Sequence, residues 1–255
     1  FMAAVLSNRG GFYDTSTYIE EARRMGIHFL LPHINYSFHD FTANNSFIRI
    51  ALSQVKGLKK NSIDSILKIR RKKPYRSIID FLSRIDIDKL EIEALIRCGA
   101  MDDLEHSRPE MLWILKVFLK NEKLRPMFPA SPLKLKEYSF RYKLLAELEH
   151  LNLTVSGHFL TLFKSPSEVT QAIKLPHFIG CSVTLTGCIV TTKQTLTQSN
   201  RPMKFMTLED STALFDAILF PVVYKQFGPL LFDRGPYIIK GRVKKEGRSI
   251  SITVS

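Results

Sequence analysis

The 255-residue sequence has few cysteines, no long apolar run and a shortage of acidic residues. Its 3 cysteines are Cys98, Cys181 and Cys188, and no pair of them has the CxxC spacing of a zinc or redox motif. This sparse, odd set excludes a disulfide framework and indicates reduced thiols, as in cytoplasmic proteins. No apolar run approaches about 18 residues, so the sequence predicts no membrane span, and we find no signal peptide.

The acidic shortage indicates what the protein binds. Lys and Arg number 37 against 24 Asp and Glu, which gives a net charge of +13 and a pI near 9.7. This balance predicts a polyanionic partner, and it favours nucleic acid over a membrane surface. The alternative is a basic soluble protein without such a partner. The charge is concentrated, since Lys56–Arg76 contains nine basic residues and one acid, Asp64.

Hydrophobic periodicity predicts a multidomain α+β protein. The period is close to 3.6 over the first two thirds of the chain and changes to 2 from Ser182 onward. A capping-box pattern at Thr17 and Glu20 predicts the start of one helix, and 27–31 reads as a short strand. Because the chain opens inside an apolar helical pattern without an initiator Met, we expect it to be a piece of a longer chain. Further helices are expected at 61–71, 77–85, 89–98, 108–123 and 140–151, and a helix or a strand leading into a helix at 47–55.

Two helix–turn–helix units in tandem, 47–71 and 77–99, form a quasi-repeat. In the first unit, glycine in the turn lets a backbone approach phosphate closely, and the amides at the start of the next helix attract an anion. An ordinary helical corner with a glycine cap is the alternative, and the lysine density favours duplex DNA. The predicted contacts are Lys56, Gly57, Leu58, Lys59 and Lys60.

Five strand patterns follow from Ser182, with a helix expected at 222–231 between the third and the fourth, and this order matches an OB-fold barrel. Such barrels bind single strands with basic grooves and exposed aromatics. Alternation along 237–245 puts the basic side chains on one face, and we expect Phe205 to be buried and Lys204 to point outward. The alternative is that these charges only solvate the barrel. The predicted single-strand contacts are Lys193, Arg201, Lys204, Lys240, Arg242 and Lys244.

Signals for catalysis are weak. The best cluster, Glu147, Glu149, His150 and His158, lacks HExxH spacing, and neither a P-loop nor a GxSxG motif occurs. We therefore predict no catalytic residues, no metal site and no cofactor within this chain. A nuclease that uses His150 and His158 is one alternative.

Several segments, in order, resemble the C-terminal half of the alpha subunit of bacterial DNA polymerase III, the C-family replicative polymerase, or its error-prone paralogue. The matching text is FMAAVLSN, YIEEARRMGI with LPHIN, IRIALSQVKGL, IEALIRCGAMDDL, LTVSGHFLTLF, MKFMTLEDSTALFDAILFPVVY and GPYIIKGRV. The resemblance implies a cytoplasmic parent enzyme that extends DNA with Mg²⁺ and whose catalytic aspartates lie upstream of Phe1. This segment would hold duplex product and guide single-stranded template. The implied domains are the end of the fingers (1–45), the tandem helix-hairpin-helix (46–105), a helical connector (106–178) and the OB-fold (179–255).

The connector contains a Pro-rich linker, 124–135, where the family's clamp-binding peptide would fall. Met127 and Phe128 provide its apolar pair, but the leading Gln is missing, so we expect weak binding to the sliding clamp. A free-standing, non-catalytic DNA-binding adaptor with the same modules is the alternative function.

Overall fold

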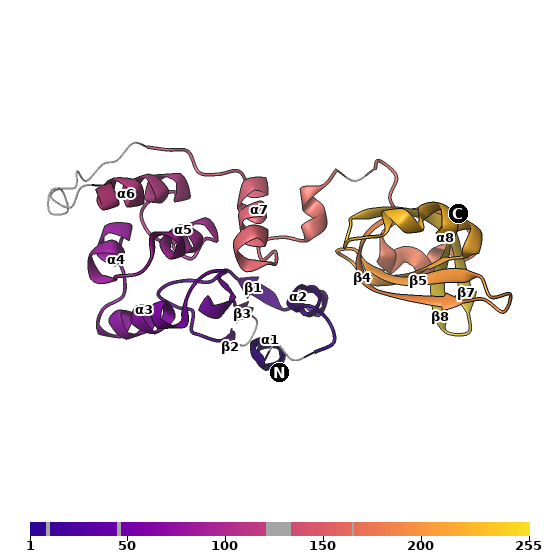
Figure 1. The fold of residues 1–255 in the computed structure, drawn as a ribbon, viewed down its shortest axis with the longest axis horizontal. Coiled ribbons are helices and arrows are strands. Elements are labelled where there is room, and N and C mark those ends of the chain that lie inside the picture. Colours follow the sequence, from indigo (N-terminus) through magenta and orange to yellow (C-terminus); the bar gives the residue numbers. More distant parts are fainter. Residues whose placement is uncertain (9–10, 45–46, 121–133, 165) are drawn as a thin grey trace. The chain divides into compact units, whose positions relative to one another are not determined.

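A computed structural model describes residues 1–8, 11–44, 47–120, 134–164 and 166–255 of the chain. The chain divides into two compact units, Phe1–Phe159 and Leu160–Ser255 (Figure 1). The first is mainly helical and the second is a β-barrel, and each has its own apolar core. The predicted fold class is therefore confirmed. The finer division into four domains stays a prediction.

The first unit opens with two helices and a small sheet. Helix α1 spans Met2–Asn8 and α2 spans Thr15–Arg24. Because α2 begins after Asp14, the expected capping box at Thr17 is wrong; the Glu20 carboxylate instead accepts a hydrogen bond from Arg23 at 2.6 Å. The sheet has the order β1-β3-β2, with β1 parallel to β3. Its strands are β1 (His28–Leu30), β2 (Thr42–Asn44) and β3 (Phe47–Arg49).

Helices α3 to α7 and a 3-10 turn follow in the described part of the first unit. The segment expected to be a helix, or a strand leading into one, before Gly57 is strand β3 followed by a 3-10 turn, η1 (Leu52–Gln54). Helix α6 packs against α4 and α5, and α5 also packs against α7. The helices are α3 (Lys60–Lys72), α4 (Ile78–Arg84), α5 (Lys89–Arg97), α6 (Arg108–Lys120) and α7 (Phe140–Leu151).

Local chemistry explains where the second pair of helices begins and ends. The Ser77 hydroxyl accepts the Asp80 amide at the start of α4, and Asp88 forms a capping box with Glu91 at the start of α5. Helix α5 ends at Gly99, whose φ of +87° is a left-handed conformation that glycine adopts without steric cost. These caps agree with the predicted helix–turn–helix boundaries.

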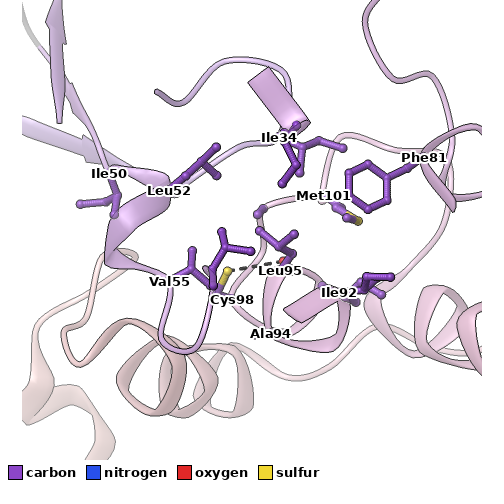
Figure 2. Packing of buried hydrophobic residues seen from close by; sticks show 14 of the residues in the cluster. Ile34, Ile50, Leu52, Val55, Phe81, Ile92, Ala94, Leu95, Cys98 and Met101 are labelled. Atoms are coloured by element: carbon purple, nitrogen blue, oxygen red, sulfur yellow. Dashed lines mark hydrogen bonds between the residues drawn. The ribbon is translucent and has the colours of Figure 1, made fainter. Parts of the chain in front are cut away.

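The core of the first unit joins the hairpin to α5. Figure 2 shows Leu52, the first residue of η1, and Val55, which follows η1, in the same cluster as Leu95 and Cys98. Leu52 and Leu95 are fully buried, and the Cys98 thiol donates to the Leu95 carbonyl at 3.4 Å. Burial of side chains of this size contributes about 1.5–3 kcal/mol each. The first hairpin is therefore held in place by packing against α5, which belongs to the second helix–turn–helix segment (77–99).

The second unit is a closed five-stranded barrel with the order β4-β5-β6-β8-β7, in which β6 and β8 are parallel. A helix, α8 (Pro221–Phe227), lies between the third and fourth strands, followed by η5 (Gly228–Leu230), so the OB-fold is confirmed. The strands are β4 (Ser182–Leu196), β5 (Pro202–Glu209), β6 (Leu214–Leu219), β7 (Tyr237–Glu246) and β8 (Ser249–Val254).

Strand β4 extends further than the pattern of hydrophobic alternation predicts. It pairs with β7 over 182–187 and with β5 over 188–196, with a register shift between Ile189 and Thr191. The shift lets one bent strand serve both sides of the barrel. Two short helical segments precede it, η3 (Phe159–Leu162) and η4 (Ala172–Phe178), and Leu175 of η4 is part of the barrel core.

Candidate nucleic-acid interface

The first hairpin exposes the predicted lysines but not all of its backbone. Lys56, Lys59 and Lys60 are exposed around Gly57, whose φ is +82° and beside which a Cβ would meet open space. A backbone can approach Gly57 closely for that reason. Leu58 is different, because its side chain lies in the core and its amide donates to the Val55 carbonyl at 3.2 Å. Neither group of Leu58 is thus free to bind phosphate.

A carboxylate of the protein already occupies the amide at the start of α3. The Lys59 N–H donates to Glu91 Oε1 at 2.7 Å, and Glu91 Oε2 accepts the Asp88 N–H at 3.2 Å. Glu91 is only 4% exposed. The amides of Lys60, Asn61 and Ser62 lie in the first turn of α3, where N–H groups have no acceptor within the helix, so they can donate to an anion at this end of α3.

A cavity of about 450 Å³ beside the hairpin has mixed charge, with acids from α5 and α7. Its carboxylates disfavour entry of a phosphate, because like charges repel at short range. Two of the three hairpin lysines, Lys56 and Lys59, line this cavity beside these acids, whereas Lys60 does not. The charged lining includes Lys56, Lys59, Asp88, Glu93, Arg97 and Glu149.

The second hairpin lacks the chemistry of the first. It carries Asp86 and Asp88 in the turn between α4 and α5, and Asp88 caps α5. The tandem repeat is structural here rather than a second basic contact. The positive charge continues instead along the last turn of α3 and the segment after it, where the exposed side chains are Lys68, Arg71, Lys72, Lys73 and Arg76.

Arg84 holds this basic segment in place. Its guanidinium donates to the Lys73 carbonyl at 2.6 Å and to the Ile69 carbonyl at 3.2 Å, and it lies 4.7 Å from the centre of the Tyr75 ring. Burial raises the pKa of Tyr75 to about 12, so the phenol stays neutral. The charge of this segment is visible in the sequence, but its bracing by Arg84 is not, because these hydrogen bonds join residues more than ten positions apart.

On the barrel, alternation along β7 is as expected. Lys240, Arg242 and Lys244 are exposed, while Ile239 and Val243 are buried between them. The Arg242 Nε donates to the Gly180 carbonyl at 2.7 Å, and the Lys244 ammonium lies 6.0 Å from the centre of the Phe220 ring. Contact of this row with DNA stays a prediction.

The expected orientation of β5 is wrong. Phe205 is 39% exposed, and Lys204 is half-buried. The register explains this, because Met206 faces Ala217 across the β5–β6 pair and both are buried, which turns Phe205 outward beside Ile218. Alternation along the sequence predicts a buried Phe205, but the pairing of β5 with β6 decides which face the ring takes.

The predicted single-strand contacts fall into two groups on the barrel. In the first group, Lys193 of β4 pairs with Phe205 of β5, and Arg201 directly precedes β5. In the second group, Lys240 of β7 pairs with Thr184 of β4. Strands β5 and β7 are not neighbours, and they pair with different halves of β4. We name the two groups the β5 face (Lys193, Arg201, Phe205 and Ile218) and the β7 face (Ile238, Lys240, Arg242 and Lys244). Lys204 belongs to neither, because it pairs with the buried Leu219 on the opposite side of β5 from Phe205.

The cluster considered for catalysis has structural contacts. Glu147 is fully buried and accepts the amides of Val155 and Ser156, and the His158 Nε2 lies 3.9 Å from Glu20. Burial lowers the pKa of His150. Among residues 1–8, 11–44, 47–120, 134–164 and 166–255, no group of three or more His, Cys, Asp or Glu side chains is arranged to hold a metal ion.

Two further predictions concern clamp binding and membrane spans. Met127 and Phe128 fall outside the described residues, so their role in clamp binding stays a prediction. No helix in the part of the chain that the structure describes is long and apolar enough to cross a membrane.

Residues 26–111 match the helix-hairpin-helix motif family. The whole chain is also 30% identical to the DNA polymerase III subunit alpha of Saccharopolyspora erythraea, covering 100% of this chain and 24% of that protein. It is 27% identical to the error-prone DNA polymerase of Symbiobacterium thermophilum, covering 100% and 29%. The chain is therefore a relative of the bacterial DNA polymerase III alpha subunits, and it spans about a quarter of the length of these relatives.

Solved structures add only a weak similarity. The SSB domain of a Synechococcus protein aligns with 29% of this chain and 89% of that chain, at 16% identity and a TM-score of 0.27. The assignment of the OB-fold rests on the strand order described above.

Proposed function

We propose that this chain is the DNA-holding segment of a polymerase of the DNA polymerase III alpha type. The hairpin and α3 hold duplex product, and the barrel guides the single-stranded template during DNA synthesis. The observation that supports this best is the similarity to such subunits over 100% of the chain. The parent enzyme would be a DNA-directed DNA polymerase that uses Mg²⁺ held by residues outside this segment.

The contacts on duplex DNA are those of the first hairpin, without Leu58. The Lys56, Lys59 and Lys60 side chains neutralise phosphates, and Gly57 permits close approach of the DNA backbone. No base edge needs to be read by such contacts, so binding is independent of sequence. Asp88 of the second hairpin lines the same cavity as Lys56 and Lys59, so negative charge lies beside this contact.

The contacts on single-stranded DNA lie on the two barrel faces. On the β5 face, Phe205 offers a ring for base stacking beside Lys193 and Arg201, and on the β7 face Lys240, Arg242 and Lys244 track phosphates. Phe205 takes the stacking role because its ring is exposed. Lys204, which is half-buried, contributes less than the other lysines.

Salt titrations test the duplex contact. The 255-residue chain is titrated against a labelled duplex at several salt concentrations, with and without Lys56→Ala, Lys59→Ala and Lys60→Ala together. With about four phosphates engaged, log K should fall against log salt with a slope near −3.6, and the triple variant should flatten it. The matched control replaces Lys116, Lys120 and Lys134, which are also exposed, by Ala. Equal slopes for both triple variants would mean that DNA lies on another face.

We also propose a weak contact with the sliding clamp through Met127 and Phe128. A short apolar pair can fill a hydrophobic pocket, but the missing Gln removes a polar anchor. Clamp binding of the wild-type chain is compared with that of the Met127→Ala, Phe128→Ala variant. Tight binding that survives both substitutions would locate the clamp contact elsewhere.

A further inference from the structure

The loop that follows β1 presents two aromatic side chains to solvent within the first unit. Tyr36 is 57% exposed and Phe38 is 52% exposed, and Ser37 between them is fully buried. Large apolar side chains exposed to this extent lose the benefit of burial. Two of them, side by side on one loop, therefore mark a surface that is built for contact.

An arginine lies over each ring. The Arg49 guanidinium, from β3, is 5.4 Å from the centre of the Tyr36 ring, and the Arg70 guanidinium, from α3, is 4.8 Å from the centre of the Phe38 ring. The buried His33 ring also packs against Tyr36, with the two ring centres 4.5 Å apart at a tilt of 30°. Each ring is thus held in place and carries positive charge beside it. We call Tyr36, Phe38, Arg49 and Arg70 the aromatic–arginine patch.

The backbone under the patch is rigidly braced. The Ser37 hydroxyl donates to the Ile50 carbonyl at 2.7 Å and accepts the His33 amide at 2.9 Å. The Asn35 side chain exchanges two hydrogen bonds of 2.8 Å with the Tyr75 backbone. Since the loop is ordered before any ligand arrives, binding to it costs little conformational entropy.

Rings and arginines together match the chemistry of unpaired nucleobases. Every base has a π-face that stacks on an aromatic ring, and the neighbouring guanidinium groups attract the phosphates that link the bases. The nearby acids are Asp40, Asp102 and Asp103, and Asp102 is paired with Arg108. The nearby cations are Arg49 and Arg70, and Arg71 and Lys72 continue the positive surface along α3. A single-stranded nucleic acid, with its negative phosphates and unpaired bases, is therefore the ligand that fits this patch best.

We infer that the aromatic–arginine patch is a second binding site for single-stranded DNA, separate in the chain from the barrel, which stacks unpaired bases on Tyr36 and Phe38. This inference rests on the proposed function, in that the chain binds DNA. The hairpin lysines hold phosphates of a duplex, whereas this patch takes bases that have left the duplex.

Affinity measurements separate this site from the barrel. Oligothymidine binding is measured for the wild-type 255-residue chain and for the aromatic variant, Tyr36→Ala with Phe38→Ala. Both measurements are repeated in chains whose barrel also carries Lys240→Ala with Arg242→Ala. We expect the aromatic variant to bind about tenfold more weakly in both. The slope of log K against log salt should not change, because stacking releases no counterions. Tyr36→Trp with Phe38→Trp should restore the affinity.

The matched control is Phe12→Ala with Tyr13→Ala, an exposed aromatic pair elsewhere in the same unit, which should bind like wild type. Oligothymidine containing 5-iododeoxyuridine should form photo-adducts at Tyr36 or Phe38, located by peptide mass spectrometry. Adducts confined to the barrel, with unchanged affinity of the aromatic variant, would overturn the inference and point to a protein ligand for the patch. If wild type binds neither oligothymidine nor duplex, the proposed function itself fails.

Discussion

The Glu91 carboxylate of α5 accepts the backbone N–H of Lys59 at 2.7 Å, so one buried side chain ties the start of α3 to the start of α5. Helix N-termini attract anions, and here the protein supplies its own anion at one amide. This hydrogen bond fixes the first hairpin relative to α5. It also places negative charge beside the lysines that we assign to duplex DNA.

Removing that charge should tighten duplex binding. Glu91→Gln removes the negative charge and keeps one acceptor oxygen for the two amides, of Lys59 and Asp88, that the carboxylate accepts, so the free energy of unfolding should fall by about 0.5–1.5 kcal/mol. Glu91→Ala leaves buried amides without an acceptor and should cost about 1–3 kcal/mol. Urea unfolding and duplex titration measure both effects. Weaker duplex binding by a well-folded Glu91→Gln variant would show that the carboxylate assists the DNA contact.

Phe205→Ala should separate binding from stability on the barrel. The ring is exposed, so the variant should melt close to wild type while its affinity for oligothymidine falls by about 1–3 kcal/mol. Phe215→Ala is the matched control, since Phe215 is 4% exposed and its loss should cost about 3–5 kcal/mol of stability. Thermal melting and oligothymidine titration decide between the two. A large drop in melting temperature for Phe205→Ala would mean that its ring supports the core after all.

Lys240→Ala with Arg242→Ala tests the β7 face in the same assay. Exposed charges contribute little to stability, so the fold should be retained while single-strand affinity falls and its salt dependence flattens. Lys174→Ala with Lys225→Ala removes the same charge from other exposed positions of the second unit and should bind like wild type. If the two pairs behave alike, only the total charge of the barrel matters.

Acid should destabilise the first unit through its buried histidines. Burial lowers the pKa of His33 despite the opposing effect of Asp103, and burial also lowers that of His150. Their ordinary value is 6.5, so the unfolded chain binds protons more readily than the folded chain. This contribution is fully present above about pH 6.5 and is lost as the pH falls from there towards the lowered values. Unfolding followed between pH 7.5 and 5 should show it, and His33→Gln should reduce the slope. Equal slopes would exclude His33 as the cause.

The three thiols should differ in reactivity. Cys181 is exposed, whereas Cys98 and Cys188 are buried. Burial raises the pKa of the Cys98 thiol to about 12, which suppresses the reactive thiolate. A thiol reagent such as DTNB should therefore modify one group quickly in the native chain and the others only on unfolding. Rapid reaction that persists in Cys181→Ser would contradict this assignment.

Much of the fold follows from local pattern. Ser77 and Asp88 sit directly before helices whose apolar spacing is 3.6, and short-range hydrogen bonds then decide where those helices begin. The strands after Ser182 alternate with period 2, which predicts the barrel with its helix between the third and fourth strands. These signals lie within a few residues of one another, so the sequence alone carries them.

The candidate interface depends on contacts that no local pattern contains. The position of Phe205 is decided by the register between β5 and β6, and the anion at the Lys59 amide comes from a residue 32 positions away. Likewise, Arg49 and Arg70 reach Tyr36 and Phe38 only because β3 and α3 pack beside their loop. The sequence by itself determined the modules, their order and the net positive charge. The tertiary structure decided which side chains face solvent together, because burial and pairing are set by residues far apart in the chain.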